Sequence, residues 1–353
     1  MNYRGIFYYL GIYVSLISIF SILNILYSIY FNSVTNLNSY IFSFTSSTIV
    51  GFSLFLIGRN SNKNISPSDQ LILMIITFLF LPILISIPYL FSDNNFSFLD
   101  SYFESVSGFT TTGFSVVQNI NSIDEPLLLW RSSSQLLGGL VFLVFAIGTL
   151  GSKYTKIKPT YLLSEVNLVS NFYNNFNYNF LKISLIYFSS TVFVIFLYSL
   201  TDLRLLDSVN LAFTSVSSGG FLPSENLSSI LKNDLQIFVF SITLLIPIFN
   251  FFLFYDVFTR QFLFKNHYED LHIGTLIALL TLFLYFFVIP EEGFANVFLA
   301  ITSSISTSGL TTYSSFLDLS LFFILLTIVG GSLISTSSGF KYTRIYILLK
   351  ISY

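Results

Sequence analysis

Residues 98–114 read FLDSYFESVSGFTTTGF, and two later stretches, LLDSVNLAFTSVSSGGF at 205–221 and FANVFLAITSSISTSGL at 294–310, follow the same plan. Each has a polar residue near its start, then about nine amphipathic residues, then a tract of Ser, Thr and Gly that ends in Gly-Phe or Gly-Leu. The polar residue and the glycine lie 13 positions apart in all three, as in Asp100 and Gly113, Asp207 and Gly220, and Asn296 and Gly309. This constant spacing predicts an internal repeat.

The rest of the chain has the composition of a membrane protein. Hydrophobic residues make up 54% of the 353 residues and charged residues only 9%. Apolar blocks of about 20 residues are long enough to cross a bilayer as helices. We expect spans at 6–30, 40–58, 70–91, 127–150, 181–200, 235–256 and 271–290, with a shorter apolar run at 316–329. The predicted fold is therefore an all-α membrane protein, embedded in a lipid bilayer and crossing it several times.

The charged residues predict which way the chain is oriented. With the N-terminus in the cytoplasm, all but three of the 15 basic residues fall on the cytoplasmic side, the exceptions being Arg131, Arg204 and Lys232. That bias satisfies the positive-inside rule. Most acidic residues then lie on the outer side, where they would raise the local concentration of cations.

The three short amphipathic segments are too short to cross the bilayer, so we expect each to enter the membrane and return. Backbone that is not helical is tolerated at membrane depth only inside protein or beside water. We expect Asp100, Asp207 and Asn296 to cap the outer ends of these helices. Each helix would then direct its partly negative C-terminal end towards its tract, which favours a cation.

The tracts offer oxygen atoms that could replace the water around a dehydrated cation. Backbone carbonyls serve this purpose in selectivity filters, and glycine permits the necessary backbone angles. The predicted ion-binding residues are Thr110, Thr111, Thr112, Gly113, Ser217, Ser218, Gly219, Gly220, Ser306, Thr307, Ser308 and Gly309. Selection by neutral carbonyls suits a monovalent ion. The alternative is that these small residues only let helices pack closely.

A fourth polar segment, GGSLISTSSGFKYTR at 330–344, follows the apolar run at 316–329. Its glycines and serines disfavour a continuous helix, although it begins only half a bilayer from the outer side. We expect it to unwind in the membrane and to act as a gate below the tracts. A flexible linker outside the membrane is the alternative. The predicted gate residues are Gly330, Gly331, Ser335, Thr336 and Gly339.

Five segments of the sequence carry a family resemblance. FESVSGFTTTGF at 103–114, with LLLWRSSSQLLGGLVF at 127–142, resembles the first pore repeat of the Trk/Ktr/HKT superfamily of potassium transporters. The tracts at 213–221 and 303–312 resemble the second and third filter segments, and 330–344 resembles the intramembrane loop of that superfamily, with Ser338 in place of a usual glycine.

The resemblance implies a Trk-type membrane subunit with one filter glycine per repeat, namely Gly113, Gly220 and Gly309. It implies two leading helices (1–66) and pore repeats at 67–158, 159–265 and 266–353, with the fourth repeat of the family absent from these residues. It also implies potassium as the transported ligand, a homodimer, a cytoplasmic nucleotide-binding regulatory ring, and a bacterial-type inner membrane. A separate chain could carry the fourth repeat. Neither an organic cofactor nor nucleic acid is expected.

Three other functions remain as alternatives. A truncated, non-conducting or regulatory subunit would follow from the absent repeat. A secondary transporter would need ionisable residues inside its spans, which are nearly free of them here. An enzyme is not expected, because the sequence contains no P-loop, dinucleotide-binding fingerprint or nucleophile elbow. His267 and His272 are five positions apart and would not share one helix face as a metal pair. The absence of cysteine also excludes disulfides and thiolate metal sites.

Overall fold

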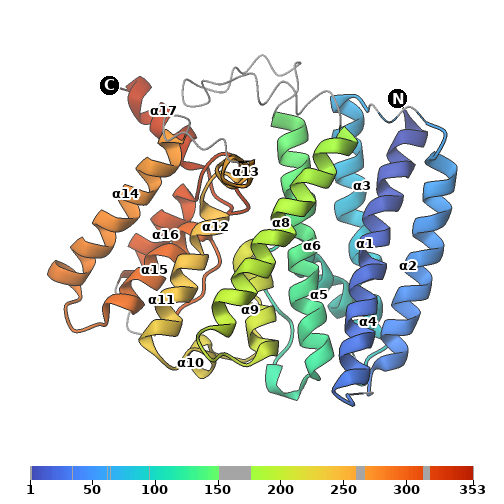
Figure 1. Ribbon diagram of the computed structural model, residues 1–353, viewed down its shortest axis with the longest axis horizontal. Coiled ribbons are helices and arrows are strands. Elements are labelled where there is room, and N and C mark those ends of the chain that lie inside the picture. The colour runs from blue at the N-terminus through green and yellow to red at the C-terminus, as the bar shows by residue number, and fades with distance from the viewer. Residues whose placement is uncertain are drawn as a thin grey trace. The chain divides into compact units, whose positions relative to one another are not determined.

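The computed structural model describes residues 2–33, 35–61, 63, 65–94, 96–150, 176–259, 267–312 and 319–352. All regular secondary structure in these ranges is helical. The helices form two compact units, one extending to Ser184 and the other beginning at Leu185 (Figure 1). Each unit is described by itself.

The first unit is built on a hairpin of two long helices. α1 (Tyr3–Tyr30) packs against α2 (Leu37–Gly58), and glycines allow close approach: a Cβ atom on Gly58 would lie 2.4 Å from the Tyr8 amide nitrogen. The unit continues through the elements that follow: α3 (Pro67–Ile85), α4 (Ile87–Leu90), α5 (Phe98–Phe109), the 3₁₀ turn Ile120–Ser122, α6 (Glu125–Leu150) and the start of α8 (Phe176–Ser199). Small residues thus let two spanning helices pack backbone to backbone.

The second unit surrounds a short buried helix, α15 (Phe294–Ser306). Its other elements are the rest of α8, α9 (Leu205–Ser217), α10 (Leu227–Ile230), α11 (Asp234–Thr243), α12 (Leu245–Ile248), α13 (Phe251–Thr259), α14 (Tyr268–Phe283) with a π-helical turn at Leu284–Val288, α16 (Ser320–Val329) and α17 (Tyr342–Ser352). Val297 and Ile301 of α15 pack into a core with Ile248, Ile277 and Leu326.

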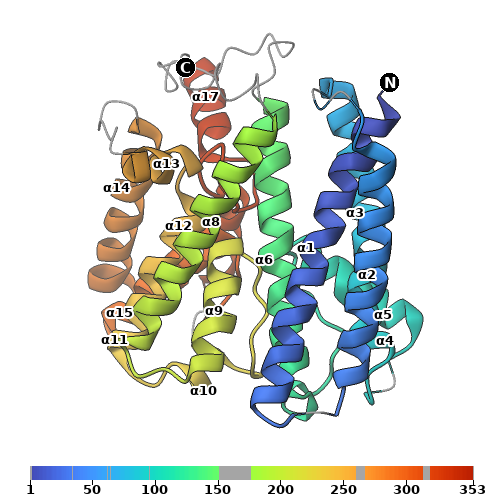
Figure 2. The same cartoon turned by 45° about the vertical axis from the view of Figure 1, so that its right-hand side comes forward.

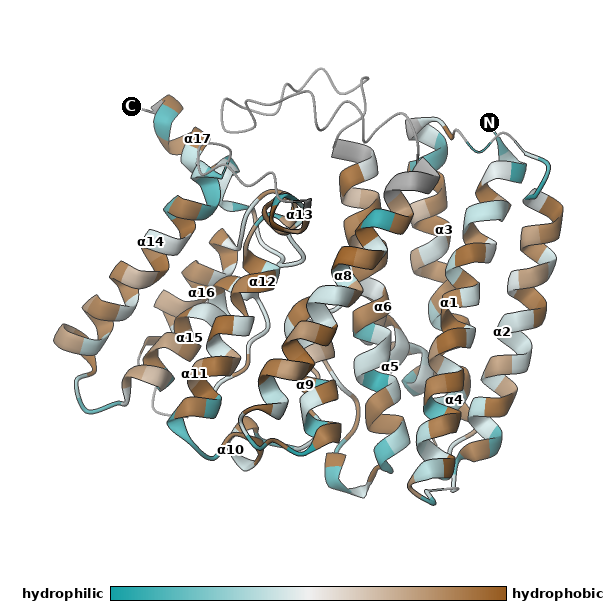
Figure 3. Cartoon of the chain, in the orientation of Figure 1, coloured by the Kyte–Doolittle hydropathy of each residue, from teal (hydrophilic) through white to brown (hydrophobic). Residues whose placement is uncertain are grey.

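Most of the predicted spans are confirmed. Within the described ranges, six helices are long and apolar enough to cross a membrane, or seven if one bent pair counts as a span. Large apolar side chains such as Leu79, Val192 and Leu279 are more than 60% exposed, as expected for surfaces that face lipid rather than water. Figure 3 shows the apolar character along these helices. The chain is a multi-pass membrane protein.

The span predicted at 235–256 is present only as a bent pair of helical segments. The segments Asp234–Ile248 and Phe251–Phe258 meet at 99°, and α13 leaves the direction of α11 and α12 (Figure 2). Pro247 lies just before the break, where its ring removes a backbone donor and opposes a continuous helix. For the shorter run at 316–329, the structure shows helix from Ser320 to Val329, and residues 313–318 lie outside the described ranges.

Candidate functional site

The three short helices, α5, α9 and α15, end with the same backbone conformation. Each is followed by a residue in the left-handed region, and two positions later by a glycine that also has a positive φ. The residues are Thr111 (55°) and Gly113 (82°), Ser218 (62°) and Gly220 (85°), and Thr307 (65°) and Gly309 (67°). Glycine adopts these angles without steric cost. The repeat predicted from sequence spacing is therefore present in the backbone.

Equivalent hydrogen bonds close the three helix ends. The amide after the left-handed residue donates to the carbonyl five residues earlier: Thr112 to Ser107 at 2.9 Å, Gly219 to Thr214 at 2.9 Å and Ser308 to Ser303 at 3.1 Å. This is the long bond of a Schellman motif, which ends a helix and turns the chain away from its axis. Each tract therefore leaves its helix as non-helical backbone.

The predicted helix caps are misplaced by three residues. Asp100, Asp207 and Asn296 lie inside the first turns, because the cap positions belong to Ser97, Arg204 and Gly293. Ser97 accepts from the Asp100 amide at 3.2 Å and its hydroxyl donates to the Asp100 carboxylate at 2.6 Å. Asp207 instead pairs with Arg204, and Asn296 accepts from Thr312. The two aspartates still lie where a negative charge stabilises a helix N-terminus.

The hydroxyl groups of three predicted ion-binding residues lie at the ends of the same three helices. Thr110, Ser217 and Ser306 each donate to a carbonyl of their own helix, at 2.7, 2.7 and 3.0 Å. A hydroxyl oxygen that donates its hydrogen keeps lone pairs that a cation can use. Ser217 and Ser306 are fully buried, whereas Thr110 is exposed in the first unit.

A buried ion pair holds the backbone that follows the first tract. The Glu104 carboxylate of α5 accepts from Arg131 Nε of α6 at 2.9 Å, and the two side chains are 0% and 2% exposed. The same carboxylate accepts from the Ser115 hydroxyl at 3.0 Å and from the Val116 amide at 3.1 Å. Arg131 was assigned to the outer side on sequence grounds, but the structure encloses it with Glu104, and the two charges neutralise each other.

The end of α5 also sits directly on α6. A Cβ atom on Gly138 would lie 1.8 Å from the Phe109 carbonyl oxygen, so no larger residue fits without displacing α5. Phe109 is the last residue of α5 and is completely buried. Gly138 and the Glu104–Arg131 pair together fix the position of the first tract within its unit.

The second and third tracts touch each other in the second unit. The Ser218 hydroxyl donates to the Ser306 carbonyl oxygen and lies 3.4 Å from the Thr307 hydroxyl. Thus the C-terminal ends of α9 and α15 converge. Segments that are 88 positions apart in the sequence are brought together by their half-helices.

The segment between α16 and α17 is not helical from Gly330 to Lys341, as predicted. It lies against both converging helix ends. The Thr336 hydroxyl donates to the Val216 carbonyl of α9 at 3.0 Å, and the Ser338 amide donates to the Thr307 hydroxyl after α15 at 2.9 Å. Gly330 and Gly339 pack against one another, both with positive φ, and a Cβ atom on Gly339 would lie 2.9 Å from the Gly330 Cα atom.

On its other side, this segment pairs with the break between α12 and α13. Three backbone hydrogen bonds join them: Ser332 N to Ile248 O at 2.8 Å, Ser337 N to Pro247 O at 3.0 Å, and Phe251 N to Ile334 O at 2.7 Å. The loop, defined here as residues 330–341, therefore lies between the tract ends and the bend.

A cluster of buried ionisable side chains lies beside the bend. His267 Nε2 is 3.0 Å from Asp256 Oδ2 of α13, and its Nδ1 is 3.5 Å from Asp270 Oδ2 of α14. Burial by itself lowers the pKa of His267, but the hydrogen bonds and negative charges of Asp270 and Asp256 outweigh it and raise the pKa. His267 is thus a buried bridge between two helices.

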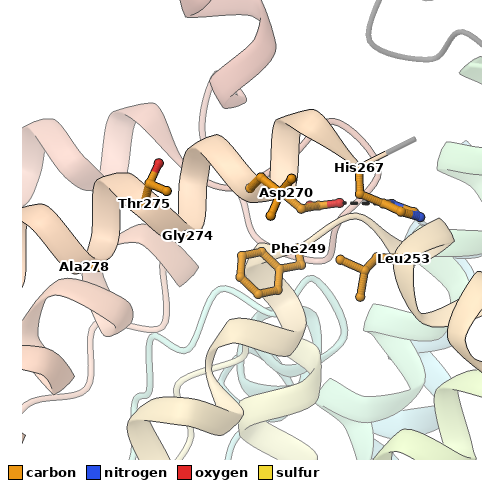
Figure 4. A pocket seen from close by; sticks show the side chains of 8 residues that line it. Phe249, Leu253, His267, Asp270, Gly274, Thr275 and Ala278 are labelled. Carbon is orange, nitrogen blue, oxygen red and sulfur yellow. Dashed lines mark ion pairs between the residues drawn. The ribbon is translucent and has the colours of Figure 1, made fainter. Parts of the chain in front are cut away.

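A pocket of about 310 Å³ opens next to this cluster, with mostly apolar walls that include Phe249, Leu253 and Ala278. Figure 4 shows His267 and Asp270 at its rim with their ion pair. In the described part of the chain, no group of three or more His, Asp or Glu side chains could hold a metal ion. The cluster joins α13 to the start of α14 through His267.

Sequence reasoning found the tracts and the loop but missed the groups that hold them. The missed residues are Glu104, Arg131, Gly138, Glu269 and Lys341. Two signals in the sequence could have identified them. One is the glycine pair in the LLGGLV segment, and the other is the presence of isolated charged residues in apolar sequence, since a charge in such surroundings is usually paired.

Comparison with known proteins agrees with the geometry. No protein-family profile matches the sequence. An uncharacterised cation transporter of Methanocaldococcus jannaschii is 26% identical over 351 residues, which cover 98% of this chain and 72% of the relative. The Trk system potassium uptake protein TrkG of Escherichia coli is 27% identical over 313 residues, covering 83% of this chain and 64% of TrkG.

The fold has a counterpart among solved structures. The crystal structure of the potassium transporter TrkH from Vibrio parahaemolyticus matches with a TM-score of 0.80 and 22% identity, over 99% of this chain and 75% of the TrkH chain. The chain thus spans just under two thirds of TrkG, and these relatives are transporters, not enzymes. In sequence the chain is similar to Trk-type membrane subunits, and it shares the fold of TrkH.

Proposed function

We propose that the chain is a membrane pore-forming subunit for potassium uptake and that its three tracts line the selectivity filter. The main support is the shared geometry of the tracts: three half-helices end in equivalent Schellman bonds, each followed by a glycine with positive φ. If the small residues served only to let helices pack closely, three equivalent non-helical endings would not be needed. The choice of potassium as the transported ion rests on the relatives that are named for potassium uptake.

In this mechanism, two features of each repeat act on the same cation. The C-terminal ends of α5, α9 and α15 carry partial negative charge that attracts it. The backbone carbonyls of residues 110–113, 217–220 and 306–309 replace its water shell. Because these donors are neutral, they would favour a monovalent ion over a divalent one.

The loop is the proposed gate. Its hydrogen bonds to Val216 and Thr307 hold it against two of the three tract ends, where it would obstruct an ion leaving the filter. Gly330, Gly331, Ser335, Thr336 and Gly339 are the residues assigned to this role. The loop is fixed by hydrogen bonds, and not by a continuous helix, so it can move without unfolding a span.

The assembly around this path is also a proposal. We assign two leading helices to 1–66 and pore repeats to 67–158, 159–265 and 266–353, with the N-terminus in the cytoplasm. A fourth tract would come from residues beyond these 353 or from a separate chain. By similarity to Trk-type systems, the subunit would form a homodimer and would bind a cytoplasmic nucleotide-binding ring.

The test is cation flux in liposomes that contain the purified protein with whatever chain completes the assembly. Rubidium, a potassium substitute, should pass faster than sodium. Gly113→Ser should reduce this preference, because a side chain is strained at a φ of 82°. Gly274→Ala is the matched control, since its Cβ would meet only the Phe249 ring, at ordinary distances of 3.7 and 4.0 Å. Sodium flux equal to rubidium flux, or an unchanged ratio in Gly113→Ser, would contradict the filter assignment.

A further inference from the structure

The loop ends at a lysine whose ammonium group is turned back into it. Lys341 is 7% exposed and has a φ of 76°, an unusual conformation for a residue with a side chain. Its Nζ atom donates to the Ser335 carbonyl at 3.2 Å, to the Ser335 hydroxyl at 3.0 Å and to the Ser337 carbonyl. An ammonium group has three hydrogens, so the loop itself supplies an acceptor for each of them.

A glutamate from a different helix accepts a hydrogen bond from the same loop. Glu269 lies in the first turn of α14 and is 7% exposed. Its Oε1 atom accepts from the Leu333 amide of the loop at 3.0 Å and from the Thr343 hydroxyl just after the loop. Two opposite charges therefore hold the loop backbone, one through its carbonyls and one through an amide.

The neighbouring acid connects this contact to the bend. Asp270, next to Glu269 on α14, accepts from the Asn250 amide at 2.7 Å. Asn250 lies in the break between α12 and α13, whose backbone already pairs with the loop. The N-terminal turn of α14 thus binds the loop directly through Glu269, and through Asp270 it binds the break between α12 and α13 on which the loop rests.

Burying these charges has a free-energy cost that a purely structural turn would not need. A buried charge is tolerated when hydrogen bonds and an opposite charge satisfy it, and removing one partner leaves the other uncompensated. Leaving this arrangement would require the loop to give up the hydrogen bonds of Lys341 and Glu269. The apolar sequence around it offers many uncharged ways to pack a turn.

We propose that Lys341 and Glu269 form an electrostatic latch that keeps the loop seated against the tract ends, and that releasing this latch opens the ion path without changing ion selectivity. The latch rests on the proposed function only for its effect on flux. The position of the loop can be measured separately.

The chain offers a clean reporter of loop position because it contains no cysteine. Ser332 is 0% exposed, and its hydroxyl has no hydrogen-bond partner in the described part of the chain, so Ser332→Cys preserves the contacts seen there. Ser47 in α2 has the same two properties, and Ser47→Cys serves as the matched control for general unfolding. The rate of thiol modification by a small methanethiosulfonate in liposomes reports loop exposure.

Glu269→Gln and Lys341→Met are then introduced separately into the Ser332→Cys protein. Each should raise the modification rate of Cys at position 332 by about tenfold to a hundredfold, since a hydrogen bond to a charged group is lost in a local opening equilibrium. Thr343→Val removes only the hydroxyl donor and should produce a smaller rise in a well-folded protein. Lys350→Met removes an exposed charge of α17 and should change nothing.

Rubidium and sodium fluxes are measured on the same liposomes. Faster modification at position 332 together with higher flux and an unchanged rubidium-to-sodium ratio supports the latch and the gate together. Faster modification without higher flux supports the latch but overturns the gating role assigned to the loop. Unchanged modification in Glu269→Gln, Lys341→Met and Thr343→Val, with position 47 protected throughout, overturns the latch.

Discussion

The buried Glu104–Arg131 pair predicts a thermodynamic signature that a superficial ion pair would not give. Glu104→Gln keeps the shape of the side chain and an oxygen that can accept from Val116, but it leaves the Arg131 guanidinium without its charged partner. Arg131→Met leaves the Glu104 carboxylate uncompensated. Removing one member of such a pair costs about 3–5 kcal/mol. Domains are stable by only roughly 5–15 kcal/mol, so either single variant should unfold at a clearly lower temperature.

The double variant Glu104→Gln/Arg131→Met should be more stable than either single variant, because no uncompensated charge remains. Thermal unfolding in one detergent gives all four stabilities of the cycle. The exposed pair Arg204–Asp207, whose side chains are 58% and 19% exposed, is the control, and its variants should shift stability by about 1 kcal/mol or less. A double variant as unstable as the sum of the singles would refute the view that the charges mainly compensate each other.

Two further variants test the packing of the tract and the charge cluster. Gly138→Ala should lower both thermal stability and rubidium selectivity, because its Cβ would overlap the Phe109 carbonyl oxygen at 1.8 Å. Gly274→Ala, the control, should lower neither. A Gly138→Ala protein that stays stable and selective would contradict the close packing of α5 on α6. Since the pKa of His267 is raised by folding, its stabilisation is present at low pH and lost as pH rises through the folded-state value. His267→Gln should therefore lower the melting temperature more at pH 6 than at pH 9, with exposed His272→Gln as the control, and an equal loss at both pH values would exclude a charged bridge.

The sequence was sufficient to predict the repeated elements because their signals are local. Glycines at a fixed distance from a polar residue predicted the helix endings, and the φ angles of Gly113, Gly220 and Gly309 agree with that prediction. The caps were assigned to the most polar residue near each start. For α5 the correct signal was readable, since Ser97 and Asp100 are spaced as a capping box. Arg204 and Gly293 carry no such signal.

The rest depended on contacts between distant segments. Glu104 and Arg131 are 27 positions apart and Glu269 and Thr343 are 74 apart. Neither spacing identifies a partner, since every charge in an apolar sequence requires one and the sequence does not say which. Hydropathy also concealed the bend, because Pro247 and Asn250 lie in a segment whose average is as apolar as that of a straight span. Average hydropathy records which residues enter the membrane, but not where their backbone leaves the helix.

The bend and the loop explain one another. Each is a break in helical structure at a place where water is scarce, and each exposes backbone groups that would cost several kcal/mol if they were left unsatisfied. The break near Pro247 and Ile248 frees carbonyl oxygens, which accept from the Ser337 and Ser332 amides of the loop, and the Phe251 amide donates in return to the loop. Either break alone would be unstable, whereas together they form one hydrogen-bonded unit. A loop held in this way rests against a fixed partner and can leave only by giving up identifiable bonds. The charged groups that hold it, Lys341 at its end and Glu269 on α14, can therefore set how readily it leaves.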